Sequence, residues 1–160
     1  MSDQTKLFPP TAEEMTAKID GLISDLILGR SGGPYGLTLG TIEKSLLRLL
    51  RFQRGHEKAV SIGTLQEYLD ADARTIKQAV RTLRLNYRLP IGSSKQSAGG
   101  GYYIMITPQD VAIWSKDVLD QVRAEVAVLR AAAGEQAGLE ILGQLRNEAL
   151  NALQEETAHA

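Results

Sequence analysis

Apolar side chains recur every three or four positions in the first thirty residues, the spacing that places them on one face of an α-helix. Thr11 precedes this run and Glu14 stands three residues later, the pattern of a capping box, while Gly29 follows the run. We therefore predict a helix from Thr11 to near Gly29. Its apolar stripe consists of Met15, Ile19, Leu22, Ile23, Leu26 and Ile27.

The stretch 29–40 holds five glycines and a proline, which predicts a loop or hinge. Its glycines do not form a phosphate-binding loop, because no Lys-Ser or Lys-Thr pair follows at the required spacing. Thr41 is expected to cap the next helix, over 41–55, with Arg48, Arg51 and Arg54 on its outer face. The stripe expected to be buried is Ile42, Leu46, Leu49, Leu50 and Phe52.

Two short helices are expected after a β-branched segment at 59–62. Gly63 and Thr64 open the first, which places Leu65, Tyr68 and Leu69 on one face. Asp72 is the expected N-cap of the second, because Asp is favoured at that position. The side chains that the second helix should bury are Ile76, Val80, Leu83 and Tyr87. About three residues separate the two helices, the tight turn of a helix-turn-helix.

Beyond Tyr87 the hydrophobic period changes from helix to strand. Residues 89–94 and 101–107 predict two strands joined by 95–100, whose glycines and serine suit a hairpin. Such a hairpin beside the second helix of a helix-turn-helix is a wing. Thr107, Pro108 and Asp110 then combine an N-cap, a proline at the first helical position and an acid at the third, a strong helix start.

The C-terminal third predicts helices beyond this core. One should run from Pro108 to about Ala133, with apolar residues every three or four positions. Gly134 and Gly138 bracket an expected break, after which Leu142, Leu145, Ala149 and Leu153 indicate another helix. Few of these positions hold Leu or Ile, so the pattern fits a packed helical hairpin and an extended coiled coil equally well.

Charge is distributed unevenly along the chain. Between Lys44 and Lys95 there are 11 basic and four acidic residues, a balance of +7, so the remainder sums to -8 within a net charge of -1. A basic segment between acidic ends is typical of a chain whose middle meets a polyanion. Lys and Arg that merely solvate helix faces would give the same count.

Residues 61–104 resemble the winged-helix domains at the N-termini of many bacterial transcription regulators, and those encoded by phages and mobile elements. Asp72-Ala73-Arg74-Thr75-Ile76 matches the start of their recognition helix, Leu89-Pro90-Ile91-Gly92-Ser93 their first wing strand, and Gly101-Tyr102-Tyr103-Ile104 their second. The resemblance covers a little over a quarter of the chain. The segment TLQEYLDA is shorter and less apolar than the second helix of many members, which leaves the subfamily open.

The helix after Asp72 is expected to face DNA with its polar side. The N-terminal part of a recognition helix enters the major groove, so Arg74, Thr75, Lys77, Gln78 and Arg81 are the residues expected near base edges. Arg84 and Arg88 lie further along and are expected to contact phosphates. Lys95 and the serines of the hairpin are placed to reach a minor groove or the flanking backbone.

Other classes of function fit less well. His56 and His159 are the only histidines and there is no cysteine, so no catalytic triad, metal site or cofactor site can be assembled, and no enzyme activity is expected. Trp114, Tyr102 and Tyr103 suggest base stacking, but packing of the hairpin on the following helix explains them more simply. A winged-helix adaptor that binds protein is the alternative to DNA binding.

The sequence thus predicts a mainly α fold with a small β wing. We expect an N-terminal helix and Gly-rich linker at 1–40, a winged-helix domain at 41–107, and a C-terminal helical extension at 108–160. The expected function is duplex DNA binding, in transcription regulation or in replication, partition or excision of a mobile element. The apolar stripes of the terminal helices predict a homodimer. No signal peptide, membrane span or small-molecule ligand is indicated, and the expected location is the cytoplasm.

Overall fold

The computed structural model describes residues 11–30, 38–95 and 101–158. This part of the chain is mainly helical, with a small antiparallel sheet of three strands in the order β1-β3-β2. It divides into two compact units, one up to Ser115 and one from Lys116 onward, and the boundary falls inside helix α5. The chain was expected to divide at 40 and 107, whereas the first unit here takes in both the N-terminal helix and the first turns of α5.

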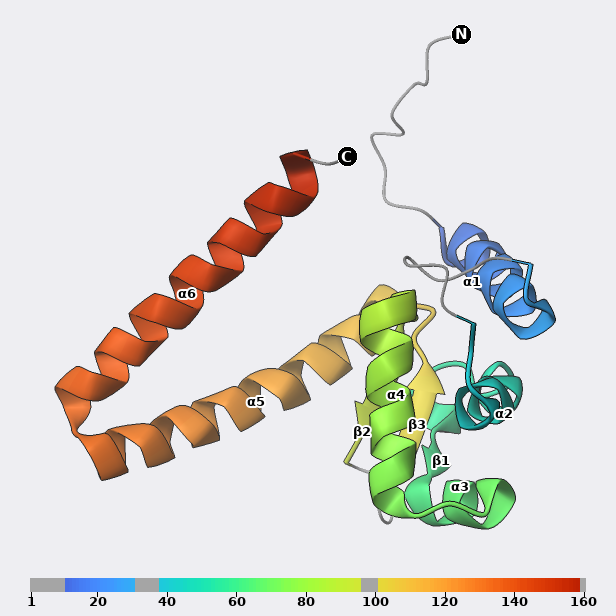
Figure 1. The fold of residues 1–160 in the computed structure, drawn as a ribbon, viewed down its shortest axis with the longest axis horizontal. Coiled ribbons are helices and arrows are strands. Elements are labelled where there is room, and N and C mark those ends of the chain that lie inside the picture. Colours follow the sequence, from blue (N-terminus) through green and yellow to red (C-terminus); the bar gives the residue numbers. More distant parts are fainter. Residues whose placement is uncertain (1–10, 31–37, 96–100, 159–160) are drawn as a thin grey trace, which may run out of the picture. The chain divides into compact units, whose positions relative to one another are not determined.

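Helix α1 (Ala12–Leu28) begins and ends as its sequence predicts. Thr11 and Glu14 form the expected capping box, and Gly29 ends the helix in the left-handed conformation at φ 68°. Ile19, Ile23 and Leu26 are buried, and α1 packs against α2 (Thr41–Leu50) (Figure 1). The N-terminal apolar stripe is therefore covered within the chain. Most of the Gly-rich linker, 31–37, lies outside the described residues.

Three expectations for the segment 41–54 are wrong. The N-cap of α2 is Gly40, not Thr41, and no side chain caps it. Phe52 lies beyond the end of the helix and is 63% exposed, while Leu47, which the stripe omitted, is fully buried. Arg54 is half-buried because its guanidinium pairs with Asp20 of α1.

Helices α3 (Ile62–Leu69) and α4 (Ala73–Tyr87) are joined by three residues, as expected. Ser61 caps α3, so this helix starts earlier than Gly63, and Tyr68 is exposed because it does not share the buried face of Leu65 and Leu69. Asp70 ends α3 at φ 47°, a left-handed conformation that Asp adopts more readily than most residues. This residue reverses the chain between the two helices.

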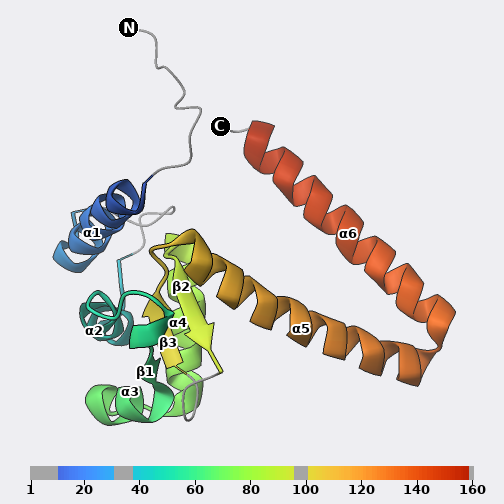
Figure 2. The same cartoon turned by 180° about the vertical axis from the view of Figure 1, so that it is seen from behind.

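Strands β2 (Ile91–Ser94) and β3 (Gly101–Ile104) form the expected antiparallel hairpin, whose tip, 96–100, lies outside the described residues. The short β1 (Val60–Ser61) adds to the other edge of β3. Gly92 stands opposite Tyr103 in the register, and a Cβ there would lie 2.6 Å from the tyrosine ring. In both views α4 lies across one face of this sheet (Figures 1 and 2).

The core of the first unit lies between α1, α2, α3, α4 and the sheet. All four residues predicted to be buried on α4 are buried, among them Ile76 and Leu83 with no exposed surface. Leu46 and Leu50 of α2 and Leu65 of α3 meet them in the same cluster. Burial of each such side chain is worth about 1.5 to 3 kcal/mol. The inner face of α4 is thereby fixed, and its outer face is left to solvent.

The second unit contains the rest of α5 (Pro108–Ala133) and all of α6 (Glu135–Ala158). Gly134 separates the two helices with φ 87°, a conformation that favours glycine. Gly138 was expected to mark the end of the break, but it lies inside α6. It is buried because the two helices meet there: a Cβ on Gly138 would lie 2.6 Å from Cγ of Arg130.

Candidate nucleic-acid interface

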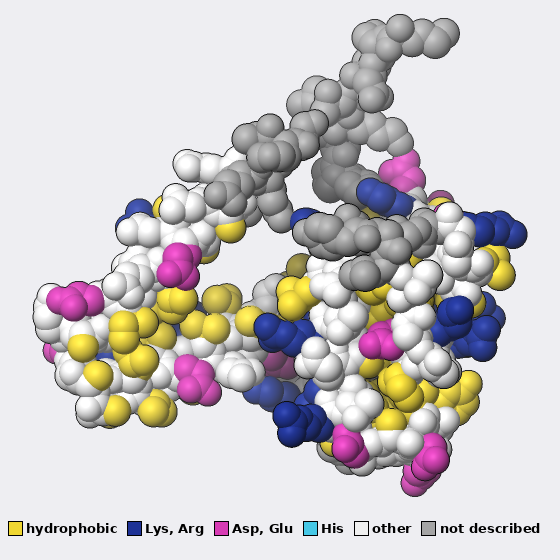
Figure 3. Space-filling view, in the orientation of Figure 1, with side chains coloured by type: hydrophobic (Ala, Val, Ile, Leu, Met, Phe, Trp, Pro, Cys, Tyr) yellow, Lys and Arg dark blue, Asp and Glu magenta, His cyan; other side chains and the backbone are white. Residues whose placement is uncertain are grey.

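The outer face of α4 is polar and mostly basic. Arg74, Thr75, Lys77, Gln78 and Arg81 are all exposed, and Ile76, Val80 and Leu83 lie on the opposite side of the same helix in the core. Figure 3 shows Lys and Arg side chains along one flank of α4, with a second group over α1 and α2. The five residues expected near base edges therefore do share one accessible surface.

The start of α4 is held by its cap. The Asp72 carboxylate accepts a hydrogen bond from the backbone N–H of Thr75 at 2.7 Å. This bond, followed by one from the Thr75 side chain, lowers the pKa of Asp72, so the cap is ionised at neutral pH. The cap holds Arg74 and Thr75 in fixed positions at the end of the helix that is expected to enter a groove.

Arg74, Thr75 and Gln78 also line a hollow of about 510 Å³ with the first turn of α2, where Thr41, Ile42 and Glu43 stand. Sequence reasoning missed this second element, because the contact depends on how α2 packs against α4 and leaves no local signal. The amide groups at the start of α2 favour an anion. Glu43 is an acid in the same hollow, so it opposes a phosphate placed there.

Arg84 does not belong to this exposed face, contrary to the expectation that it contacts phosphate. Its Nε donates to the carbonyl oxygen of Ile91 at 2.8 Å, and its guanidinium lies over the rings of Tyr102, 6.0 Å away, and Trp114, 5.3 Å away. Burial lowers the pKa of Arg84, and Nη2 is buried without a hydrogen-bond partner among the described residues. Arg84 joins α4 to the hairpin and to the start of α5.

The other two predicted cations lie at the edges of the surface. Arg88 is exposed and ends α4 with φ 51°. Lys95 is exposed just after β2, at the point where the described part of the hairpin stops. Tyr103 is fully buried, which leaves it no surface for base stacking, and Tyr102 and Trp114 are partly covered around Arg84.

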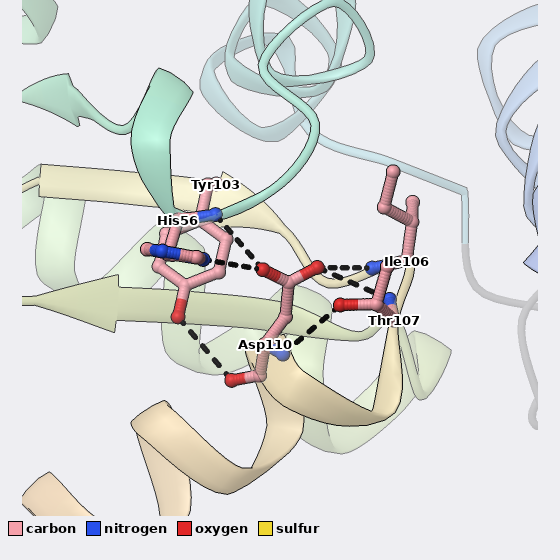
Figure 4. A network of polar contacts seen from close by, with 5 residues as sticks. All are labelled: His56, Tyr103, Ile106, Thr107 and Asp110. Carbon is pink, nitrogen blue, oxygen red and sulfur yellow. Dashed lines mark hydrogen bonds and ion pairs between the residues drawn. The ribbon is translucent and has the colours of Figure 1, made fainter.

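A second polar cluster ties α5 to the first unit (Figure 4). Asp110 is buried and its carboxylate accepts hydrogen bonds from the backbone N–H and Nδ1 of His56, at 3.0 and 2.9 Å, and from the N–H groups of Ile106 and Thr107, both at 3.1 Å. Thr107 Oγ1 accepts from the N–H of Asp110, which completes the predicted helix start. Burial raises the pKa of Asp110, but these bonds outweigh it and lower the pKa to about 2.

The sequence predicted the Thr107 and Asp110 cap but not the contribution of His56, which is 54 residues away. Of the four hydrogen bonds that the Asp110 carboxylate accepts, three come from backbone N–H groups and one from the His56 ring, so the His–Asp pair fixes the start of α5 against the segment at His56. Within the described residues, no three His, Asp or Glu side chains are grouped to hold a metal ion. The described helices also include none with the length and apolar character needed to cross a membrane.

Comparisons of the chain with protein-family models, with curated proteins and with solved structures give no match.

Proposed function

We propose that residues 41–107 form a winged helix-turn-helix and bind duplex DNA. The observation that carries the proposal is the outer face of α4, where Arg74, Lys77 and Arg81 are exposed while the inner face is held in the core. Helix α3, a three-residue turn and α4 supply the helix-turn-helix, and the β2–β3 hairpin after α4 supplies the wing. The balance of +7 between Lys44 and Lys95 supports a polyanionic partner.

In this proposal the start of α4 enters the major groove. Arg74 and Arg81 offer guanidinium groups that pair with guanine, and Gln78 an amide that pairs with adenine. Lys77 offers a further donor to base edges, and Arg88 and Lys95 supply charge to the phosphate backbone. Such a protein serves as a transcription regulator or as a replication, partition or excision factor of a mobile element.

The test is a charge reversal on α4. Lys77→Glu/Arg81→Glu is expected to weaken binding to a selected duplex at least about 30-fold, because each lost contact costs about 1 kcal/mol or more. Both side chains are exposed, so the thermal unfolding temperature should change little. The matched control is Arg123→Glu/Arg146→Glu, which changes the net charge equally outside the first unit. Equal duplex affinity of the α4 variant and the control would refute the proposal.

A protein-binding adaptor is the second candidate, and two exposed apolar side chains favour it. Tyr68 on α3 is 60% exposed and Leu85 on α4 is 61% exposed. Solvent-exposed apolar residues of this size suit a protein partner better than a phosphate backbone. In that case Tyr68→Ser/Leu85→Ser would abolish partner binding, and a selection from random duplexes would enrich no sequence.

A further inference from the structure

The second unit has almost no interior of its own. In residues 116–152 of this unit only Gly138 is buried, whereas eight large apolar side chains are more than a third exposed: Val118, Leu119, Val122, Val128, Leu139, Ile141, Leu145 and Leu150. Helices in water obtain most of their stability from burying an apolar face. Two helices of this length and exposure need a further surface to pack against.

Four of these eight side chains, Val118, Val122, Ile141 and Leu145, line a groove between α5 and α6. It has a volume of about 480 Å³, and its apolar lining is Val118, Val122, Val126, Leu129, Ile141, Leu142 and Leu145. Figure 3 shows hydrophobic side chains over α5 and in the angle between the two helices. The polar residues that share the lining are Gln121 and Glu125, both from α5.

The exposed apolar area suits a dimer. The four groove side chains that are more than a third exposed, Val118, Val122, Ile141 and Leu145, offer on the order of 300 Å² of surface, and the partly buried Val126, Leu129 and Leu142 add to it. A standard interface buries about 800 Å² on each partner, and a little over half of that area is apolar. With Gln121 and Glu125 at its margin, the groove approaches the size of a specific interface.

A second copy of the same hairpin fits the groove in its apolar pattern. The groove takes apolar residues from both helices, four from α5 (Val118, Val122, Val126 and Leu129) and three from α6 (Ile141, Leu142 and Leu145). A two-fold axis therefore brings the same apolar lining of two copies face to face, as in an isologous four-helix arrangement. Along the flank of α5, Lys116 and Arg123 both pair with Asp120, so these two cations already have a partner within the chain.

We infer that the groove between α5 and α6 is the dimer interface of this protein, and that its occupant is the same hairpin of a second copy. This inference does not depend on DNA binding, because it follows from the second unit alone. The second unit carries four basic and eight acidic residues. Two such units repel each other weakly, and salt screens that repulsion while leaving the apolar contact intact.

Sedimentation equilibrium of the full chain, without DNA, tests the inference. The wild type is expected at about twice its chain mass of 17.4 kDa, and to remain so at about 1 M salt, where charges further apart than about 3 Å are screened. Val122→Glu/Leu145→Glu should sediment as a monomer. Val122→Ala/Leu145→Ala, which keeps good helix formers, should weaken the dimer at least about tenfold.

The matched control is Val128→Glu/Leu150→Glu. It places the same residue types on the same two helices at exposed positions that do not line the groove, so it should remain dimeric. A monomeric wild type would overturn the inference and leave another protein as the occupant. A groove variant as dimeric as the control would overturn it as well. Neither result alters the duplex-binding test, whose variants lie on α4.

Discussion

Exposure along α4 separates residues that sequence spacing places together. Arg81 and Arg84 are three positions apart, nearly one helical turn, and both belong to the polar side of the helix. Arg84 lies at the edge nearest the hairpin, where the rings of Tyr102 and Trp114 and the carbonyl of Ile91 receive it. Long side chains of this kind pack their stems along apolar surface, so a basic residue at a boundary position can serve structure instead of recognition.

This difference gives opposite expectations for two alanine variants. Arg84→Ala should lower the free energy of unfolding by about 1 to 3 kcal/mol, because it removes a hydrogen bond and packing around two aromatic rings. Arg81→Ala should leave stability nearly unchanged but weaken binding to a selected duplex by about 1 to 3 kcal/mol and relax the base preference at one position. Urea unfolding and duplex titrations at several salt concentrations measure the two effects.

Fluorescence provides a check that is specific to Arg84. Trp114 is the only tryptophan in the chain and lies 5.3 Å from the Arg84 guanidinium. Its emission should shift in Arg84→Ala and stay as in the wild type in Arg81→Ala. If the Arg84→Ala protein is as stable as the wild type and its duplex affinity falls less steeply with salt concentration, Arg84 is a phosphate contact.

At the scale of elements, the boundaries that local chemistry determines were predictable from sequence. Thr11, Asp72 and Thr107 each cap a helix through residues three positions away, so the signal and the contact lie within one turn. The cap of α2 was not predictable, because Gly40 makes no side-chain bond and Gly and Thr are about equally favoured as N-caps. The burial of Arg54 depends on its pairing with Asp20 of α1, which lies about thirty residues earlier in the sequence, and Phe52 is exposed because α2 ends before it.

In the candidate site, too, some features follow from local sequence and others depend on contacts between distant segments. The inward face of α4 and the five exposed residues at its start follow from helical period alone. The hollow shared with α2 and the bond from His56 to Asp110 join segments that are far apart in sequence, and no local pattern encodes them.

Asp110 fixes the first turn of α5, and its substitution tests that role. The Asp110 side chain is 3% exposed. In Asp110→Asn the side-chain NH2 group would replace one carboxylate oxygen and would face N–H donors that now have an acceptor. Asp110→Asn is therefore expected to lower the free energy of unfolding at pH 7 by about 2 to 4 kcal/mol. Asp120→Asn, which removes an exposed carboxylate on the same helix, is the control and should have little effect.

The pH dependence of this loss follows from the pKa of Asp110. A folded pKa of about 2 against an ordinary value of 3.8 means that the unfolded chain binds the proton more readily, so the carboxylate stabilises the fold fully above about pH 4. That contribution, about 2 kcal/mol, is lost as the pH falls toward 2. The stability difference between wild type and Asp110→Asn should narrow by this amount over that interval. A constant difference would mean that the carboxylate charge contributes nothing.

At the scale of the whole molecule, the two units differ in what holds them together. The first has a continuous core from α1 to β3, whereas residues 116–152 of the second include no buried apolar side chain. Helix α5 crosses from one to the other, and its first turn is fixed by Asp110 and Thr107. Folding of the first unit thus holds the start of α5, while the inferred dimer would stabilise the helices beyond Lys116.

Stability of the second unit should therefore depend on protein concentration. Association stabilises only the folded form, so dilution below the dimer dissociation constant should reduce the helical signal in far-ultraviolet circular dichroism. The loss should be partial, because the first unit and the start of α5 keep their own contacts. Val122→Glu/Leu145→Glu should show the reduced signal at every concentration, with Trp114 fluorescence as in the wild type, and Val128→Glu/Leu150→Glu should follow the wild-type dilution curve. If the helical signal of the wild type does not depend on concentration, and Val122→Glu/Leu145→Glu gives the same signal, then α5 and α6 are stable without a partner.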